Sequence, residues 1–386
     1  MSRHASTSVA VDVPFNQPYT SGAELDYIGE AIASAHLSGN GPFTRKCAAW
    51  LEEALGAPRV LLTHSCTGAL EMSTLLAEIG PGDEVIMPSF TFTSTATAVA
   101  LRGGTPVFVD IRDDTLNIDE KLVAQAVTGR TRAIMPVHYA GVGCAMDEFL
   151  EIAHRHQLVV IEDAAHALGS SLAGRPLGAI GTLGALSFHE TKNVISGEGG
   201  ALIINDAALV ARAEILQEKG TNRRAFFRGE VDKYTWLDLG SSFLASELTC
   251  AFLWAQLERA EWLNAERLRI WERYHDGFLG LEQAGLVRRP IIPEDAVHNA
   301  HLYFLLTPDE GSRNHLIDEL GRQRVRTVFH YLPLHSSPAG RRFGRQAGEL
   351  PVTDRASATL LRLPLWVGMS EGQIEHVIAA VHRALA

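Results

Sequence analysis

The fold of this chain is decided by two stretches, Leu158-Val-Val-Ile-Glu-Asp163-Ala-Ala-His166 and Ala185-Leu-Ser-Phe-His-Glu-Thr-Lys192-Asn193. Each begins with a short apolar run that is typical of a buried strand, and each then turns polar. The first run places an acid at the carboxyl end of its strand, and the second places an amine in the loop after its strand. An acid and an amine in these positions indicate a shared chemical site.

The two runs belong to a series of seven, separated mostly by helix-length segments. Strands that alternate with helices predict an α/β fold with a mostly parallel, doubly wound sheet. Residues 189–200 contain three glycines and no helical pattern, so they do not form the usual helical crossover between parallel strands. The seventh strand is therefore expected to run antiparallel to the sixth. The runs are Val60–Leu62, Glu84–Met87, Pro106–Val109, Ala133–Val137, Leu158–Ile161, Ala185–Phe188 and Ala201–Ile204.

The rest of the chain is expected to be helical and then mixed. A helix from Ser246 to about Gln283 has apolar residues near one face and carries the chain out of the large domain. We expect a mobile segment at residues 1–13, a large α/β domain at 14–260 and a small α+β domain at 261–386. The elements expected in the small domain are strands at His301–Leu306 and Arg324–Tyr331 and helices at Arg313–Gly321, Asp354–Leu361 and Ser370–Leu385.

Composition excludes several classes of protein. A chain of 386 residues with 46% hydrophobic residues is long enough for more than one core. Its net charge of -11 argues against binding to nucleic acid or to an anionic membrane surface, since both rely on clustered Lys and Arg. The four cysteines form no CxxC pair, so neither a disulfide framework nor a structural zinc site is indicated. No apolar stretch reaches the roughly 18 residues of a membrane span, and we expect a cytoplasmic protein.

Lys192 and Asp163 are the residue types that pyridoxal phosphate requires. This cofactor needs a lysine that bonds to its aldehyde, a carboxylate that keeps its ring nitrogen protonated, and a cup for its phosphate. A carboxylate about 4 Å from a pyridinium gains about 4 kcal/mol at an effective dielectric constant of about 20, which is roughly 3 pKa units. The alternative for Asp163 is a helix N-cap after the strand. Its neighbour Glu162 is given no role.

The phosphate cup is expected at Ser65-Cys66-Thr67-Gly68, where a strand turns tightly into a helix. Free backbone N–H groups and the helix dipole favour an anion there. The dipole contributes only about 0.3 to 1 kcal/mol, so the hydroxyl groups of Thr67 and Ser187 are expected to complete the cup. The alternative is that these small residues only cap and pack the helix.

Two further side chains are candidates for contact with the cofactor ring. Phe92 follows the second strand and can lie flat on the ring, which adds about 0.5 to 1.5 kcal/mol to simple burial. His166 lies three residues after Asp163 and is placed to approach the phenolic oxygen of the ring or the lysine. The alternatives are a core phenylalanine and a packed histidine.

The loop Lys219–Gly229 interleaves cations with aromatic residues. Arg224 and Arg228 are therefore candidates for binding a diphosphate beside a flat nucleobase, with a solvated surface loop as the alternative. No pair of histidines has an acidic partner at metal-ligand spacing, so no metal site is expected.

Longer runs of the sequence resemble a known family. They are Gly41-Pro-Phe-Thr-Arg45, Pro81-Gly-Asp-Glu-Val-Ile-Met-Pro-Ser-Phe-Thr-Phe92, Pro136-Val-His-Tyr-Ala-Gly141, Ser187-Phe-His-Glu-Thr-Lys192-Asn193, Glu218-Lys-Gly-Thr-Asn-Arg223 and Val328-Phe-His-Tyr-Leu-Pro-Leu-His335. From about Pro14 to the C-terminus the chain resembles the sugar-nucleotide aminotransferases of the DegT and StrS group, which are fold-type I pyridoxal phosphate enzymes. Some relatives carry histidine in place of the lysine and dehydrate sugars, whereas this sequence retains Lys192.

The resemblance implies roles for individual residues. Lys192 is the lysine that bonds to the cofactor, Asp163 is the partner of the ring nitrogen, and Phe92 stacks on the ring. The family forms homodimers with shared active sites, in which an asparagine of the partner chain completes the phosphate site; Ser242 stands at the corresponding position here. The resemblance also implies that Cys66 N–H, Thr67 and Ser187 bind the phosphate. We further expect His166 to contact the cofactor, and the candidates for contact with the substrate are Arg224, Arg228, Tyr331 and His335.

Within the family the runs are most similar to transaminases that make dTDP-4-amino-4,6-dideoxygalactose. The implied reaction moves the amino group of L-glutamate to C4 of dTDP-4-keto-6-deoxy-D-glucose, a step in building deoxyamino sugars for cell-surface polysaccharide. The alternatives within the family give the 4-epimer or a 3-amino sugar. An alternative of another class is a non-catalytic regulator that binds pyridoxal phosphate.

Overall fold

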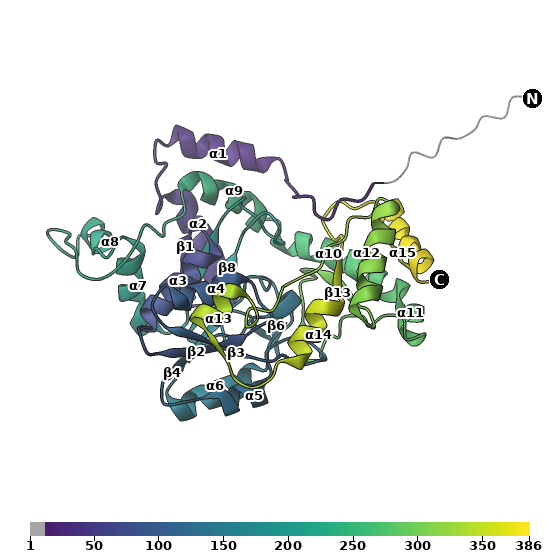
Figure 1. Ribbon diagram of the computed structural model, residues 1–386. Coiled ribbons are helices and arrows are strands. Elements are labelled where there is room, and N and C mark those ends of the chain that lie inside the picture. The colour runs from purple at the N-terminus through teal and green to yellow at the C-terminus, as the bar shows by residue number, and fades with distance from the viewer. Residues whose placement is uncertain (1–11) are drawn as a thin grey trace, which may run out of the picture.

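A computed structural model describes residues 12–386 of the chain (Figure 1). Residues 1–11, which make up most of the segment expected to be mobile, lie outside the described part. Val13 is buried and forms a bridge with Val325. In the described part of the chain no helix is long and apolar enough to cross a membrane.

An eight-stranded sheet forms the centre of the larger part of the molecule, in the order β1-β9-β8-β5-β4-β2-β3-β12. β9 is antiparallel to both of its neighbours, as predicted for the seventh strand, and the other pairings are parallel. The predicted α/β fold is therefore confirmed. The strands are β1 Arg59–Thr63, β2 Glu84–Pro88, β3 Thr105–Val109, β4 Thr131–Ile134, β5 Val159–Asp163, β8 Leu183–Ser187, β9 Gly200–Ile204 and β12 Arg345–Gln346.

Side chains on the two faces of this sheet build two cores. Val60 and Leu62 of β1 belong to one cluster and Leu61 to the other, because successive side chains of a strand point to opposite faces. Helices α2, α5, α6 and α9 cover the first face, and α3, α4 and α7 cover the second. Their bounds are α2 Pro42–Leu55, α3 Cys66–Leu76, α4 Thr93–Ala100, α5 Glu120–Ala126, α6 Met146–His156, α7 Val210–Gln217 and α9 Glu247–Leu257.

The eighth strand, β12, was not expected from the sequence. It contains only two residues, comes from the C-terminal part of the chain and pairs with β3. Arg345 donates hydrogen bonds of 2.9 and 2.8 Å to the buried carboxylate of Glu84 in β2. These hydrogen bonds lower the pKa of Glu84 to about 2. Two residues carry no strand pattern, so β12 is recognised only in the structure, by its pairing with β3 and by this ion pair.

A further core lies beside the sheet, at the right of Figure 1. It packs α10 (Ala260–Gly277), α12 (Glu310–Arg322) and α15 (Glu371–Leu385) against a small sheet of β11 (Tyr303–Leu306) and β13 (Leu360–Leu363). The remaining elements are α1 Ala23–Ala33, α8 Arg223–Phe227, α11 Leu279–Gln283, α13 Pro338–Phe343, α14 Pro351–Thr359, β6 Ser171–Leu172, β7 Arg175–Pro176, β10 Ala296–Val297, η1 Tyr139–Gly141 and η2 Ala207–Leu209.

Two expectations for this part of the chain are wrong. The single helix expected from Ser246 to Gln283 is divided into α9, α10 and α11. The expected strand Arg324–Tyr331 forms only isolated bridges, because it crosses the free edge of β13 at one point instead of running along it. The helix expected around Asp354–Leu361 is present as α14, with shifted bounds, and the chain continues as β13 because its apolar residues pair with β11.

Candidate functional site

The carboxyl ends of several strands meet at one edge of the central sheet. Thr63 of β1 and Ser187 of β8 both lie opposite Gly200 of β9. Asp163 is the last residue of β5, which pairs in parallel with β8. The loop with Lys192 leaves β8 at this edge and returns as β9. The fold therefore brings the predicted acid and the predicted amine to the same edge.

Helix α3 begins at this edge, directly after β1. The hydroxyl group of Ser65 caps the helix by accepting a backbone hydrogen bond of 3.1 Å. A Cβ atom on Gly200 would lie 2.4 Å from the backbone nitrogen of Cys66, so only glycine lets β9 start against the helix end. The first N–H groups of a helix have no intrahelical acceptor, and the hydroxyl of Thr67 lies 2.7 Å from that of Ser94. These donors are suited to bind an anion at the helix end.

Asp163 is buried, and its carboxylate accepts hydrogen bonds from the Thr95 hydroxyl at 2.8 Å and from the Ala165 N–H at 3.2 Å. Burial raises the pKa of Asp163, while these hydrogen bonds and the charge of Lys192 oppose that rise. A cation that enters the site stabilises the ionised form further. The carboxylate is thus suited to face a protonated ring nitrogen.

Lys192 lies in a tight turn in which its N–H donates to the carbonyl of His189 at 2.9 Å. Burial lowers the pKa of Lys192 to about 8, and the guanidinium of Arg362 acts in the same direction, whereas Cys66 and Asp163 raise it. A larger fraction of this amine is therefore unprotonated near neutral pH than of an ordinary lysine. An unprotonated amine is the form that attacks an aldehyde.

His166 is buried and stacks on His301, with ring centroids 4.1 Å apart. The hydroxyl of Tyr331 lies 3.2 Å from His166 Nε2. Burial lowers the pKa of His166 well below its ordinary value, so the ring is neutral. Its Nδ1 atom is buried and has no hydrogen-bond partner among residues 12–386. Buried polar atoms are usually paired, so this nitrogen is free to form a hydrogen bond with a ligand.

The assembled groups fit pyridoxal phosphate. The open helix end at Cys66 and Thr67 suits the phosphate, Asp163 suits the ring nitrogen, and the amine of Lys192 suits the aldehyde. The unpartnered His166 Nδ1 is a polar atom that the cofactor would satisfy.

Three other predicted residues have the following surroundings in the structure. Phe92 precedes α4 and is 60% exposed, so its ring is accessible to a ligand. Ser242 is exposed and bridges to Glu218, and Leu244 just after it bridges to Thr63 at the end of β1. His335 accepts or donates a hydrogen bond of 2.8 Å with Ser89, just after β2.

The two predicted substrate arginines lie outside the Lys192 group of the same chain. Arg228 pairs with Glu214 at 2.7 Å, and Arg224 donates to Gln217 at 3.1 Å beside the same acid. Both glutamate and glutamine belong to α7, so the arginines are held against that helix. Neither arginine contacts Lys192 or Asp163 of the same chain at these positions.

Sequence reasoning missed three residues of the site. Thr95 holds Asp163 from one turn inside α4, and nothing in its run of small polar residues distinguishes it. His301 stacks on His166 from a different part of the chain, and no local pattern indicates it. Arg362 acts on the pKa of Lys192, and its signal was present as a single cation inside the apolar strand β13.

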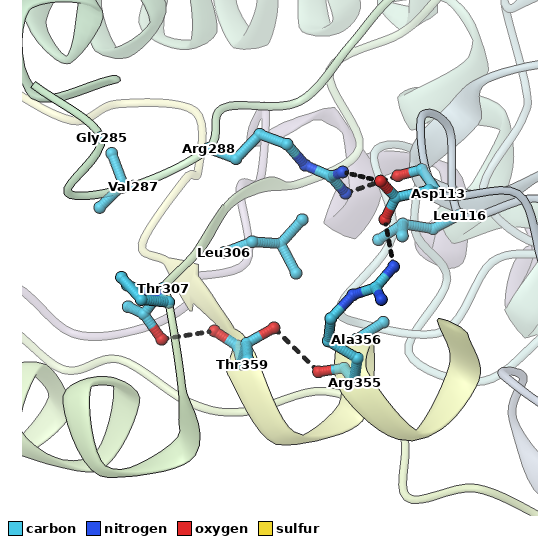
Figure 2. A pocket seen from close by; sticks show the side chains of 11 residues that line it. Asp113, Leu116, Gly285, Val287, Arg288, Leu306, Thr307, Arg355, Ala356 and Thr359 are labelled. Atoms are coloured by element: carbon cyan, nitrogen blue, oxygen red, sulfur yellow. Dashed lines mark hydrogen bonds and ion pairs between the residues drawn. The ribbon is translucent and has the colours of Figure 1, made fainter. Parts of the chain in front are cut away.

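A cleft of about 260 Å³ lies elsewhere, between the segment after β3 and the small sheet (Figure 2). Figure 2 shows Arg288 and Arg355 pointing at Asp113, with nitrogen-to-oxygen distances of 2.8 Å in both ion pairs. The only acid of this cleft is therefore already paired, and none of the Lys192 group lines it. Within residues 12–386 no cluster of three or more His, Cys, Asp or Glu side chains is arranged to hold a metal ion.

Residues 18–382 match the sequence profile of the DegT/DnrJ/EryC1/StrS aminotransferase family. The spore coat polysaccharide biosynthesis protein SpsC of Bacillus subtilis is 34% identical over 377 residues, which cover 96% of this chain and 96% of SpsC. The likeness therefore extends over nearly the whole length of both chains.

Two solved structures share the fold. Aminotransferase TlmJ from Streptoalloteichus hindustanus has a TM-score of 0.88 and 32% identity, covering 97% of this chain and 98% of that one. The PLP-form of the putative sugar aminotransferase Spr1654 from Streptococcus pneumoniae has a TM-score of 0.89 and 26% identity, covering 97% of this chain and 99% of that one.

Proposed function

Because the chain belongs to the DegT/DnrJ/EryC1/StrS aminotransferase family, we propose that it moves the amino group of L-glutamate to C4 of dTDP-4-keto-6-deoxy-D-glucose. The products are dTDP-4-amino-4,6-dideoxy-D-galactose and 2-oxoglutarate. Spr1654 is described as a putative sugar aminotransferase, and SpsC is named for spore coat polysaccharide biosynthesis. These names support a sugar substrate and a role in making cell-surface polysaccharide.

Pyridoxal phosphate is the cofactor, as the family match and the PLP-form of a related structure indicate. When bound, it supplies an electron sink for the pair released as a substrate C–H bond breaks. Asp163 keeps that sink effective by holding the ring nitrogen protonated. With its amine free, Lys192 would move the proton that leaves the α-carbon of the donor. The same amine returns a proton to C4 of the sugar in the second half of the reaction.

The observation that carries this proposal is the meeting of Lys192, Asp163 and the open end of α3 at one sheet edge. A lysine there is needed for amino transfer. The match to an aminotransferase family favours a catalyst over a regulator that only binds the cofactor. The 4-epimer and the 3-amino sugar remain the alternatives within the family, because the same residues serve them.

We also propose that the protein works as a homodimer. Helix α8 and the segment after it expose large apolar side chains, with Phe227 70% and Trp236 76% exposed. A monomer rarely leaves such a group in water, so a second copy is its expected cover. Ser242, Arg224 and Arg228 would then reach the site of the partner. The cytoplasmic location stays a prediction.

The test is to mix the purified protein with pyridoxal phosphate, L-glutamate and dTDP-4-keto-6-deoxy-D-glucose and to identify the nucleotide product by NMR. We expect the axial 4-amino sugar of galactose configuration. Lys192→Ala should abolish turnover, whereas Lys121→Ala, at an exposed lysine of α5, should not change it. A 3-amino product would contradict the assigned position of amination, and an equatorial 4-amino product would contradict the assigned configuration at C4. The absence of any amino sugar would contradict the whole proposal.

A further inference from the structure

The imidazole of His166 has one paired and one unpaired nitrogen. Its Nε2 atom lies 3.2 Å from the hydroxyl of Tyr331, whereas its buried Nδ1 atom has no hydrogen-bond partner in the described part of the chain. Burial lowers the pKa of His166 well below its ordinary value, and the charges of Lys192 and Arg362 act in the same direction. The ring therefore carries a single proton, on either Nδ1 or Nε2.

The donors and acceptors around Nε2 separate these two tautomers. Burial raises the pKa of Tyr331, so its hydroxyl keeps its proton, and His166 is the only hydrogen-bond partner of that hydroxyl among residues 12–386. With the histidine proton on Nδ1, Nε2 accepts the O–H of Tyr331. With the proton on Nε2, this nitrogen donates to the tyrosine oxygen, and the tyrosine O–H is left without an acceptor. An unpaired donor costs free energy, so the first tautomer is favoured.

The ring of Tyr331 is itself held in place from two sides. It stacks on the imidazole of His330, with ring centroids 3.7 Å apart and an interplanar angle of 24°. The ring of Phe90 meets it edge-on, with centroids 5.5 Å apart and an angle of 75°. His330 is fixed in turn, because the hydroxyl of Tyr139 lies 2.7 Å from its Nδ1 atom. These contacts keep the Tyr331 hydroxyl beside His166.

A proton on Nδ1 makes the unpaired nitrogen of His166 a hydrogen-bond donor. A ligand that satisfies it must bring an acceptor, and a negatively charged oxygen is the strongest kind. The carboxylate of Asp163 does not fill this role, since it accepts from Thr95 and Ala165. Pyridoxal phosphate carries a weakly acidic phenolic oxygen beside its aldehyde, and the aldehyde is bound by Lys192. That oxygen is the acceptor that suits Nδ1.

We propose that Tyr331 is a positioning residue that holds the proton of His166 on Nδ1, so that this nitrogen donates to the phenolic oxygen of the cofactor. The ligand in this inference is the cofactor of the proposed function, whereas the tautomer is a property of the protein alone. Tyr331, which the sequence made a candidate for contact with the substrate, acts through His166 instead. A donor fixed in this way holds the cofactor ring in one orientation against Asp163.

Nitrogen NMR of the cofactor-free protein with isotope-labelled histidine measures the tautomer directly, and His166→Gln identifies the signals by removing them. We expect the wild type to carry the proton on Nδ1, and this form should become less populated in Tyr331→Phe. Tyr274→Phe is the matched control, because it removes a buried hydroxyl that donates to the carbonyl of Pro364 at 2.9 Å. A proton on Nε2 in the wild type, or an unchanged tautomer in Tyr331→Phe, would overturn the inference.

Cofactor affinity tests the consequence of the same hydrogen bond. The dissociation constant for pyridoxal phosphate should rise about threefold to tenfold in Tyr331→Phe and stay unchanged in Tyr274→Phe. A glutamine side chain offers an N–H donor that needs no choice of tautomer. Adding Tyr331→Phe to His166→Gln should therefore weaken binding by less than about twofold.

Both measurements are made without a sugar substrate, so they stand apart from the substrate and product assigned above. A tautomer and a cofactor affinity that change as expected support the role of Tyr331 even if dTDP-4-keto-6-deoxy-D-glucose is not aminated. Equal losses of cofactor affinity from Tyr331→Phe in the wild-type and His166→Gln backgrounds would overturn the inference, because Tyr331 would then act on the cofactor without His166.

Discussion

His166 and His301 stack face to face, with ring centroids 4.1 Å apart and an interplanar angle of 29°. His301 also lies 3.0 Å from the side-chain oxygen of Asn193, the residue after Lys192. The amide nitrogen of Asn193 donates elsewhere, to Asn264 and to the carbonyl of Asn299, so its oxygen must accept from His301. The neutral imidazole of His301 therefore links the ring of His166 with the loop that carries Lys192.

We expect His301→Ala to weaken cofactor binding about tenfold. The substitution leaves the Asn193 oxygen unpaired and removes the ring beneath His166, and a lost hydrogen bond of this kind costs about 1 to 3 kcal/mol. The dissociation constant for pyridoxal phosphate, followed by absorbance after dialysis, is the measurement. Asn193→Ala should have a similar effect, and the double variant should lose less than the sum of the two. His382→Ala is the control, since its ring bonds only to Gly277. If the losses of cofactor affinity in His301→Ala and Asn193→Ala simply add in the double variant, the proposed coupling between the two residues is contradicted.

Asp163→Asn should slow the half-reaction with L-glutamate about a thousandfold. The carboxylate gains about 4 kcal/mol against a protonated ring nitrogen, and an amide cannot replace that charge. Thr95→Val, which removes one hydrogen bond to Asp163, should cost about tenfold. Stopped-flow absorbance of the cofactor measures both rates. A rate for Asp163→Asn within tenfold of the wild type would show that the carboxylate does not face the ring nitrogen.

Uptake of the cofactor should depend on pH through the lowered pKa of Lys192, about 8. Only the unprotonated amine attacks the aldehyde, so the uptake rate of cofactor-free protein should rise about tenfold per pH unit below that value and level off above it. Because Asp163 raises this pKa and Arg362 lowers it, Asp163→Asn should move the plateau to lower pH and Arg362→Gln to higher pH. A rate that still rises steeply at about pH 10, where an ordinary lysine titrates, would contradict the lowered pKa.

Trp236→Asp should convert the proposed dimer into a monomer. The indole is largely exposed, and its N–H bonds to the carbonyl of Asp238 at 2.7 Å, so its apolar ring presents outward. A carboxylate in an apolar contact between two copies is strongly unfavourable. Light scattering after size exclusion measures the mass. Leu279→Asp, at a partly exposed leucine of α11, should leave the mass unchanged. An unaltered dimer in the tryptophan variant would place the contact elsewhere.

The sequence by itself determined the central sheet and the residues at its edge. Strand runs, the turn at Ser65 and the glycine-rich return after Lys192 act through neighbours in the chain, so periodicity and spacing were enough to place Asp163 and Lys192 together and to predict an antiparallel β9.

Only the tertiary structure decided the surroundings of that pair. Arg362, His301 and Thr95 come from separate segments, and their meeting depends on how α4 and the small sheet pack against the central one. The short strand β12 and the crossing of Arg324–Tyr331 over β13 were missed for the same reason. A local pattern states which face of an element is apolar, but long-range packing decides which other element covers it.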